Sequence, residues 1–240
     1  TPIADIEAAL APHRQQLMFE PADFGPLLGT SGGTIGGAVA CNLSGPRRVR
    51  AGAARDHVLG FKAVSGRGES FKSGGRMFKN VTGFDLSKLM SGSFGTLAVL
   101  TEATFKVLPA AETVRTVLIA GADPQTAVRA MTVALQSPND VSGAAHLPAD
   151  VAAISTVAAV AGGGSVTALR VEGFGPSVEY RCRALAGLLA EFGEIEHLEA
   201  EGSAVLWREI RDVHFFAGEA DSQVWRLSVA PAQGATVAER

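Results

Sequence analysis

Glycine is concentrated in one region of the chain, and this limits the possible folds more than any other feature. Sixteen of the 28 glycines fall between Gly25 and Gly95 of the 240 residues. Glycine adopts backbone conformations that other residues avoid and lets the backbone approach a neighbour closely, so we expect short elements and many tight turns there. Beyond Pro109 ordinary strand and helix patterns alternate. The sequence therefore predicts two domains, residues 1–109 and 110–240.

The first part is predicted to hold short helices around a β-hairpin. Pro2 suits the start of a helix, and the Gly66–Gly68 turn fixes the register of the hairpin. The expected elements are a helix over Ile3–Leu10, strands over His57–Val64 and from Phe71, helical turns over Phe84–Met90, and a long or bulged strand over Thr96–Leu108.

The second part is predicted to alternate strands with amphipathic helices. Asp123 suits the N-cap of a helix whose apolar face would carry Val128, Met131 and Leu135. The expected strands are Thr113–Ala120, Ser165–Gly173, Glu194–Glu199 and Gln223–Ala230 (with Trp225, Leu227 and Val229 on one side), and the expected helices are Pro124–Gln136, Ser177–Phe192 and Ser203–Phe216. This order indicates an α+β fold, an antiparallel sheet with helices on one face.

Composition argues against several classes of protein. No run of about 18 apolar residues lacks a charge, so a membrane span is not expected. Cys41 and Cys182 lie far apart, and the histidines show no metal-ligand spacing. This argues against a zinc site or a disulfide framework and favours a reducing cytoplasm.

Charge is unevenly distributed along the chain. The segment Gly45–Lys88 carries ten Lys and Arg against Asp56, Glu69 and Asp85, whereas the whole chain has a net charge of −3. Such a segment either lines a site for an anionic ligand or forms a solvated rim. Nucleic acid is the weaker partner, because the segment has few aromatic residues to stack on bases and the protein is acidic overall.

Familiar nucleotide-binding motifs are absent from the sequence. There is no G-x-G-x-x-G and no G-x-x-x-x-G-K-[ST], which disfavours a standard Rossmann dehydrogenase and a P-loop NTPase. The stretch "GTSGG", Gly29–Gly33, matches G-x-S-x-G around Ser31. A nucleophile elbow needs a buried strand before the serine and a helix after it, and neither is expected here, so a hydrolase is disfavoured.

Two loops of small residues are the more informative feature. "GGTIGGAVACNLSG", Gly32–Gly45, and "GSFGT", Gly92–Thr96, present backbone N–H groups without intervening Cβ atoms. The second leads into an apolar strand, against which a flat, partly apolar cofactor can lie. Lys79, Asn80 and Asp85 supply nearby polarity. The alternative for the first loop is a glycine-rich helix start packed against a sheet.

These segments together resemble a known flavoprotein family. "TIGGAVACNLSGPRRVRAGAARDHVLGFKAVSGRGE" and "GGRMFKNVTGFDLSKLMSGSFGTLAVLTEATFKVLP" resemble the flavin-binding domain of the vanillyl-alcohol-oxidase (PCMH-type) superfamily. Within it they are similar to the FAD-binding E-type subunits of bacterial glycolate oxidases. The resemblance implies the second half of a PCMH-type FAD-binding domain over residues 1–109. Residues 110–240 would be a ferredoxin-like α+β cap, cut short at its C-terminus.

The resemblance also implies a cofactor, a reaction and partners. Small 2-hydroxy acids would pass two electrons to FAD and on to an iron–sulfur subunit, beside a flavin-containing D-type subunit. The location would be cytoplasmic, with peripheral attachment to the inner membrane through partners as an alternative. The implied cofactor-binding residues are Thr34, Gly36, Gly37, Ala38, Cys41, Asn42, Gly45, Gly95, Thr96 and Val99.

Three departures from the family pattern qualify these expectations. The family's pyrophosphate loop is not in the sequence, so we expect an internal fragment, and its own retention of FAD stays open. Phe94 stands where the superfamily usually has an acidic residue, which keeps a non-catalytic assembly subunit as the alternative function. No H-x-H pair matches the divalent-metal site of some relatives, and no catalytic base is assigned.

Overall fold

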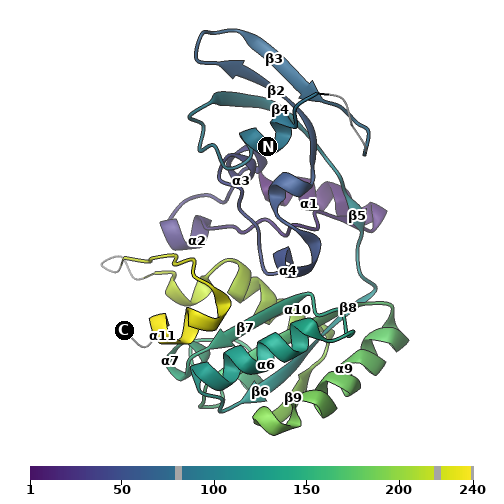
Figure 1. Ribbon diagram of the computed structural model, residues 1–240, viewed down its shortest axis with the longest axis vertical. Coiled ribbons are helices and arrows are strands. Elements are labelled where there is room, and N and C mark those ends of the chain that lie inside the picture. Colours follow the sequence, from purple (N-terminus) through teal and green to yellow (C-terminus); the bar gives the residue numbers. More distant parts are fainter. Residues whose placement is uncertain (79–82, 219–222, 239–240) are drawn as a thin grey trace. The chain divides into compact units, whose positions relative to one another are not determined.

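The computed structural model describes residues 1–78, 83–218 and 223–238 (Figure 1). The chain forms two compact units, Thr1–Ala110 and Ala111–Arg240. The division lies next to the boundary expected from the glycine distribution. That the units are part of a flavin domain and a cap stays a prediction.

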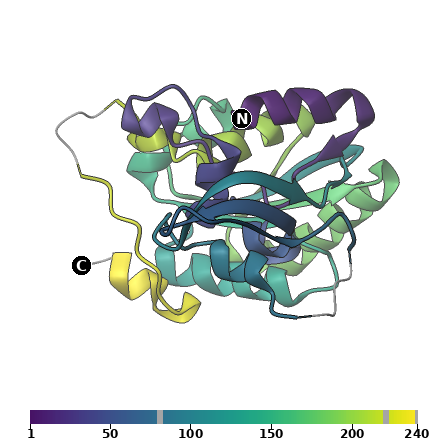
Figure 2. The ribbon, with the colours of Figure 1, turned by 90° about the horizontal axis from the view of Figure 1, so that it is seen from above.

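The first unit is built on a three-stranded antiparallel sheet with the order β3-β2-β4 (Figures 1 and 2). The predicted hairpin is confirmed, and the register of β2 against β4 shifts between Lys62 and Ala63. The elements are α1 (Ile3–Leu10), β1 (Gln15–Gln16), α2 (Gly25–Leu28), α3 (Ile35–Ala40), α4 (Arg48–Ala51), β2 (Val58–Ser65), β3 (Ser70–Gly74), α5 (Leu86–Met90), β4 (Ala98–Phe105) and β5 (Leu108–Pro109), with β1 paired to β5.

Two small apolar clusters hold this unit together. One lies between the sheet and α5 and includes Phe61, Met90 and Ala98. The other is centred on the fully buried Phe19, which lies 5.6 Å from the ring of His57, centroid to centroid. Both clusters are small, with four and three buried residues respectively.

His57 makes the stability of the first unit depend on pH. Its ring is buried, Nε2 lies 2.9 Å from the Ala51 carbonyl oxygen, and burial holds its pKa below the ordinary value of 6.5. The folded state therefore keeps this imidazole neutral while the unfolded state takes up a proton at acid pH, so stability is lost as pH falls below about 6.5.

We expect the urea midpoint of the wild type to be lower at pH 5.5 than at pH 7.5. His57→Gln retains an amide donor for Ala51 and removes the titration, so its two midpoints should lie closer together. His146, whose pKa burial also lowers, contributes to the difference that remains. An unchanged difference in the variant would rule out a contribution from His57.

The second unit has a four-stranded, fully antiparallel sheet with the order β7-β8-β6-β9. The main elements are β6 (Thr113–Ala120), α6 (Pro124–Gln136), β7 (Gly143–Leu147), β8 (Val166–Gly173), α9 (Gly175–Leu189) and β9 (Glu194–Leu198). This βαββαβ sequence with its central β6 and β8 is a ferredoxin-like arrangement, and the predicted α+β class is confirmed.

Helices cover both faces of this sheet, whereas the sequence predicted helices on one face. Val117 and Leu169 face α6 and α9, while Leu118 and Ala168 face α10 and the short α7 and α8. The additional helices are α7 (Ala149–Ala152), α8 (Ala158–Ala161) and α10 (Ala200–Arg211). Strands buried on both faces read as continuous apolar runs rather than as alternation, so the apolar runs of β6 and β8 did carry a signal of the second helical layer.

Three further details differ from the sequence-based expectations. Helix α6 buries Ala127, Ala130 and Ala134 rather than Val128, Met131 and Leu135, because alanines let the helix approach the sheet closely. Strand β7 was not predicted. Residues 223–230 form no strand, and Trp225, Leu227 and Val229 are all exposed, since no described strand pairs with them. A short helix, α11 (Gly234–Ala238), follows them.

Candidate functional site

The two glycine loops of the first unit meet at a cavity of about 340 Å³. One wall is the start of α3, and the other is the turn before β4 together with the first residues of that strand. The lining residues are Thr34, Gly36, Gly37, Ala40, Ser93, Gly95, Ala98, Val99 and Leu100. The lining carries no charged side chain, so this space suits an uncharged, partly apolar group.

Backbone hydrogen bonds fix the two loops to one another. The Gly92 N–H donates to the Val39 carbonyl at 3.0 Å, and the Phe94 N–H donates to the Ala40 carbonyl at 2.8 Å. Thr34 caps α3 by accepting a hydrogen bond from the Gly37 N–H at 3.2 Å. Main-chain groups therefore set the geometry of the cavity, whatever its side chains do.

Glycine is used differently in the cavity and in the packed parts of this unit. A Cβ atom at Gly25 would lie 2.6 Å from Gly32 N, so that glycine is required by close packing. A Cβ atom at Gly36 or Gly95 would meet nothing within 4 Å. Internal packing does not explain the glycine at Gly36, which leaves room for a ligand, whereas Gly95 has a φ of 74° that by itself favours glycine.

Five of the ten predicted cofactor-binding residues line the cavity, and five do not. The lining five are Thr34, Gly36, Gly37, Gly95 and Val99; the others are Ala38, Cys41, Asn42, Gly45 and Thr96. Asn42 accepts a hydrogen bond from the Arg55 N–H at 3.0 Å, and the Gly45 N–H donates to Phe19 and Glu20 carbonyls. The Asn42 side chain and the Gly45 backbone thus help to shape the loop, and their predicted contacts with FAD stay a prediction.

Sequence reasoning missed Ala40, Ser93, Ala98 and Leu100 as lining residues. The sequence could have indicated these residues, because they adjoin predicted residues at the end of α3 and the start of β4. The exposed Leu97 and Val99 add apolar surface at the same place. The cavity therefore has bare backbone on one side and an apolar strand on the other, and its use for a planar ring system stays a prediction.

Phe94 adopts a backbone conformation that is unfavourable for an aromatic residue. Its φ is 53°, in the left-handed region, and its side chain is 71% exposed. Asparagine tolerates this region better, so we expect Phe94→Asn to raise the free energy of unfolding by about 0.5–1 kcal/mol. Urea denaturation measures this, with Phe94→Ala as control. Equal stability of the two variants would show that the backbone is not strained.

Other candidates from the sequence occupy different surroundings. Ser31 follows the short helix α2 rather than a buried strand, so the nucleophile-elbow geometry is absent there. Asp85 caps α5 through the Lys88 N–H and pairs with Lys88 Nζ at 3.5 Å, which gives it a structural role. Lys79 and Asn80 lie outside the described residues. Among the residues that the structure describes, no group of His, Cys, Asp and Glu could hold a metal ion.

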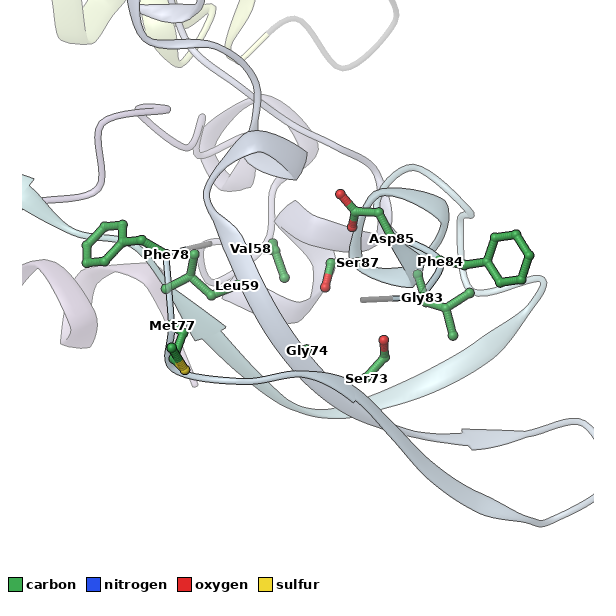
Figure 3. Close-up of a pocket in the computed structure, with 11 residues that line it drawn as sticks. Val58, Leu59, Ser73, Gly74, Met77, Phe78, Gly83, Phe84, Asp85 and Ser87 are labelled. Carbon is green, nitrogen blue, oxygen red and sulfur yellow. The ribbon is translucent and has the colours of Figure 1, made fainter. Parts of the chain in front are cut away.

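A smaller cavity of about 130 Å³ lies where β2, β3 and α5 meet (Figure 3). Phe78 and Phe84 point away from one another at its two ends and are both exposed.

Two cations of the basic segment Gly45–Lys88 have acidic partners. Arg47 pairs with Glu20 at 3.5 Å, and Lys62 pairs with Glu102 at 2.7 Å. Acidic neighbours therefore offset part of the positive charge of this segment. The use of the segment for an anionic ligand stays a prediction.

Comparison with known families gives a direct match in the first unit. Residues 1–74 match the FAD binding domain family. These 74 of the 240 residues are therefore similar to an FAD-binding domain. The match includes α3 and the first wall of the cavity. The predicted cofactor, FAD, and the predicted family resemblance are thereby confirmed.

Curated relatives agree with this assignment. Glycolate oxidase subunit GlcE of Escherichia coli (strain K12) is 50% identical over 109 residues, which are 45% of this chain and 30% of that protein. Glycolate oxidase subunit GlcD of Bacillus subtilis (strain 168) is 36% identical over 116 residues, 48% of this chain and 23% of that protein. D-lactate dehydrogenase of Archaeoglobus fulgidus is 41% identical over 86 residues, 36% of this chain and 19% of that protein. The chain thus matches less than a third of the length of these relatives.

Solved structures show the same fold over most of the chain. An alkyldihydroxyacetonephosphate synthase matches with a TM-score of 0.68 and 17% identity, over 88% of this chain and 40% of that one. At this identity the likeness concerns the fold alone.

Within the described part of the chain, no helix is long and apolar enough to span a membrane.

Proposed function

We propose that this chain is part of the FAD-binding subunit of a glycolate-oxidase-like enzyme. The enzyme would oxidise a small 2-hydroxy acid and pass electrons through FAD to an iron–sulfur partner subunit. The cavity between the two glycine loops carries the proposal, because it offers bare backbone at Gly36 on one wall, and bare backbone at Gly95 beside the apolar strand at Val99 on the other. The names of the relatives support the choice of substrate class and the multi-subunit setting.

The residues of the first unit would bind and orient the ring system of FAD. Gly36 and Gly37 would let the cofactor approach the backbone of α3, while Ala98, Val99 and Leu100 would shield it from water. Bound FAD would accept two electrons from the substrate. The protein's own contribution is placement, since the hydrogen bonds from Gly92 and Phe94 hold the walls at a fixed separation.

Phe94 favours one alternative. An assembly subunit would keep this fold and bind its partners without turnover, because the position usually occupied by an acidic residue holds an exposed phenylalanine. The glycine-lined space would then be a remnant of the cofactor site. Both functions predict association with a flavin-containing D-type subunit and an iron–sulfur subunit in the cytoplasm.

Absorbance of the purified protein separates the two functions. The full-length subunit that contains this chain would be purified alone, titrated with FAD under anaerobic conditions and then mixed with glycolate or D-lactate. A saturable flavin spectrum that bleaches with one of these acids is expected. Saturable FAD binding without bleaching, alone and with the partner subunits, would favour the assembly subunit. Failure to bind FAD would overturn the proposed role of the cavity.

A further inference from the structure

The second unit contains a separate apolar cavity of about 330 Å³ between α6, β7 and α11. Helix α11 lies beside α6 and closes one side of this space (Figure 1). The lining residues are Pro124, Val128, Met131, Ala144, Ala145, His146, Pro148, Gly234, Ala235 and Ala238. All of them except His146 are apolar.

His146 presents one nitrogen that the protein does not satisfy. Its Nδ1 lies 2.9 Å from Oγ1 of Thr167, a fully buried residue of β8. Its Nε2 is also buried but has no hydrogen-bond partner among the described residues. A buried polar atom without a partner costs about 1–3 kcal/mol, and a ligand or an ordered water is the usual explanation.

The two observations define one ligand chemistry. An apolar cavity of this volume suits a small aromatic or alicyclic molecule, and such cavities bind benzene when they are dry. The imidazole adds one hydrogen bond, as donor or acceptor depending on the direction of the Thr167 hydroxyl. The lining itself carries no charged side chain. Burial lowers the pKa of His146 by more than the nearby Asp123 carboxylate raises it, so the imidazolium is disfavoured. A neutral molecule therefore fits, whereas an anionic one would also be repelled by Asp123.

We propose that this cavity is a binding site for a small neutral ring compound bearing one hydroxyl or carbonyl group. The ring would pack against Val128 and Met131 of α6, and the polar group would bond to His146 Nε2. The site lies in the second unit and does not depend on FAD binding in the first. It adds a second ligand to the protein, of a different class from a 2-hydroxy acid.

Phenol and toluene are the matched probes for this site. They have nearly the same shape, and the phenol hydroxyl both donates and accepts, so it suits either imidazole tautomer. We expect phenol to bind the 240-residue chain with a dissociation constant at or below about 1 mM. Toluene should bind about five- to tenfold more weakly, as expected for one hydrogen bond. Two-dimensional amide spectra should show shifts in α6, β7 and α11, and the His146 ring nitrogens should shift with phenol.

Two variants test the roles of the imidazole and of the space. His146→Asn keeps an amide near the position of Nδ1 for Thr167 and removes Nε2, so phenol should fall to the affinity of toluene. Val128→Phe fills the cavity and should abolish binding of both, whereas Leu135→Phe, on the same helix outside the cavity, should leave binding unchanged. Thermal unfolding without ligand checks that each variant is folded.

Several outcomes would overturn the proposal. One is the absence of saturable phenol binding to the folded wild type, which would leave a bound water as the partner of Nε2. Another is equal affinity for phenol and toluene. A third is binding that survives Val128→Phe or that shifts only residues of the first unit. A failure of FAD binding alone leaves this inference intact, because the two sites lie in different units.

Discussion

Gly36→Leu should weaken FAD binding tenfold to a hundredfold while leaving the fold intact. A Cβ atom at this position meets nothing within 4 Å, so the larger side chain would extend into the cavity without disturbing its surroundings. Forcing a side chain into space that a ligand occupies costs about 1–3 kcal/mol, which gives the stated loss. Leucine also favours a helix over glycine by about 0.5–1 kcal/mol, so α3 should not be weakened.

Flavin fluorescence or absorbance titration measures the affinity, and urea denaturation measures stability. The matched control is Gly66→Leu, in the hairpin turn. A Cβ atom there also meets nothing within 4 Å, and Gly66 lies outside the cavity. We expect the control to bind FAD as the wild type does. Unchanged FAD affinity in Gly36→Leu would place the ring system elsewhere.

Arg170→Ala should lower the free energy of unfolding of the second unit by about 3–5 kcal/mol, which is a large share of a domain's stability. Arg170 is almost completely buried on β8, with Nε 3.5 Å from Glu172 and 3.2 Å from Ser142 Oγ. Its guanidinium lies over the Trp207 ring at 4.5 Å from the centroid. Alanine would leave a cavity beside the indole and a buried carboxylate without this cation.

Arg183→Ala is the matched control for the loss of an arginine. Arg183 is exposed on α9 and lies 3.9 Å from Glu179, so its removal should change stability by less than about 1 kcal/mol. The double variant Arg170→Met, Glu172→Gln should recover part of the loss, because no unpaired charge remains. A loss below about 1 kcal/mol for Arg170→Ala would show that the buried cation is dispensable.

Local sequence signals were enough to predict most of the secondary structure. The helix Pro124–Gln136 was predicted to its end residues because Asp123 and Pro124 mark its start and its sequence favours a helix throughout. The hairpin of β2 and β3 followed from the Gly66–Gly68 turn. The prediction of a strand at residues 223–230 was wrong because alternation of apolar and polar residues shows only that a strand is possible. A strand also needs a partner edge, which a sequence does not contain.

The candidate site was only partly predictable for a similar reason. Both loops were located from their small residues, but their meeting depends on hydrogen bonds between segments more than 50 residues apart, such as Phe94 N to Ala40 O. The same loop contains residues that face inward, such as Asn42 bonded to Arg55 N. Composition does not distinguish a glycine facing a cavity from one packed against its own chain. Only the neighbours of the glycine in the folded structure distinguish the two cases.

The two amides that join the cavity walls also provide a built-in reporter of occupancy. The N–H groups of Gly92 and Phe94 exchange their protons with solvent only when the turn before β4 separates from the end of α3. A molecule seated between these segments would make that separation rarer. Deuterium uptake at two backbone positions would therefore slow down when the cavity is filled, in any preparation of the protein and without a spectroscopic label.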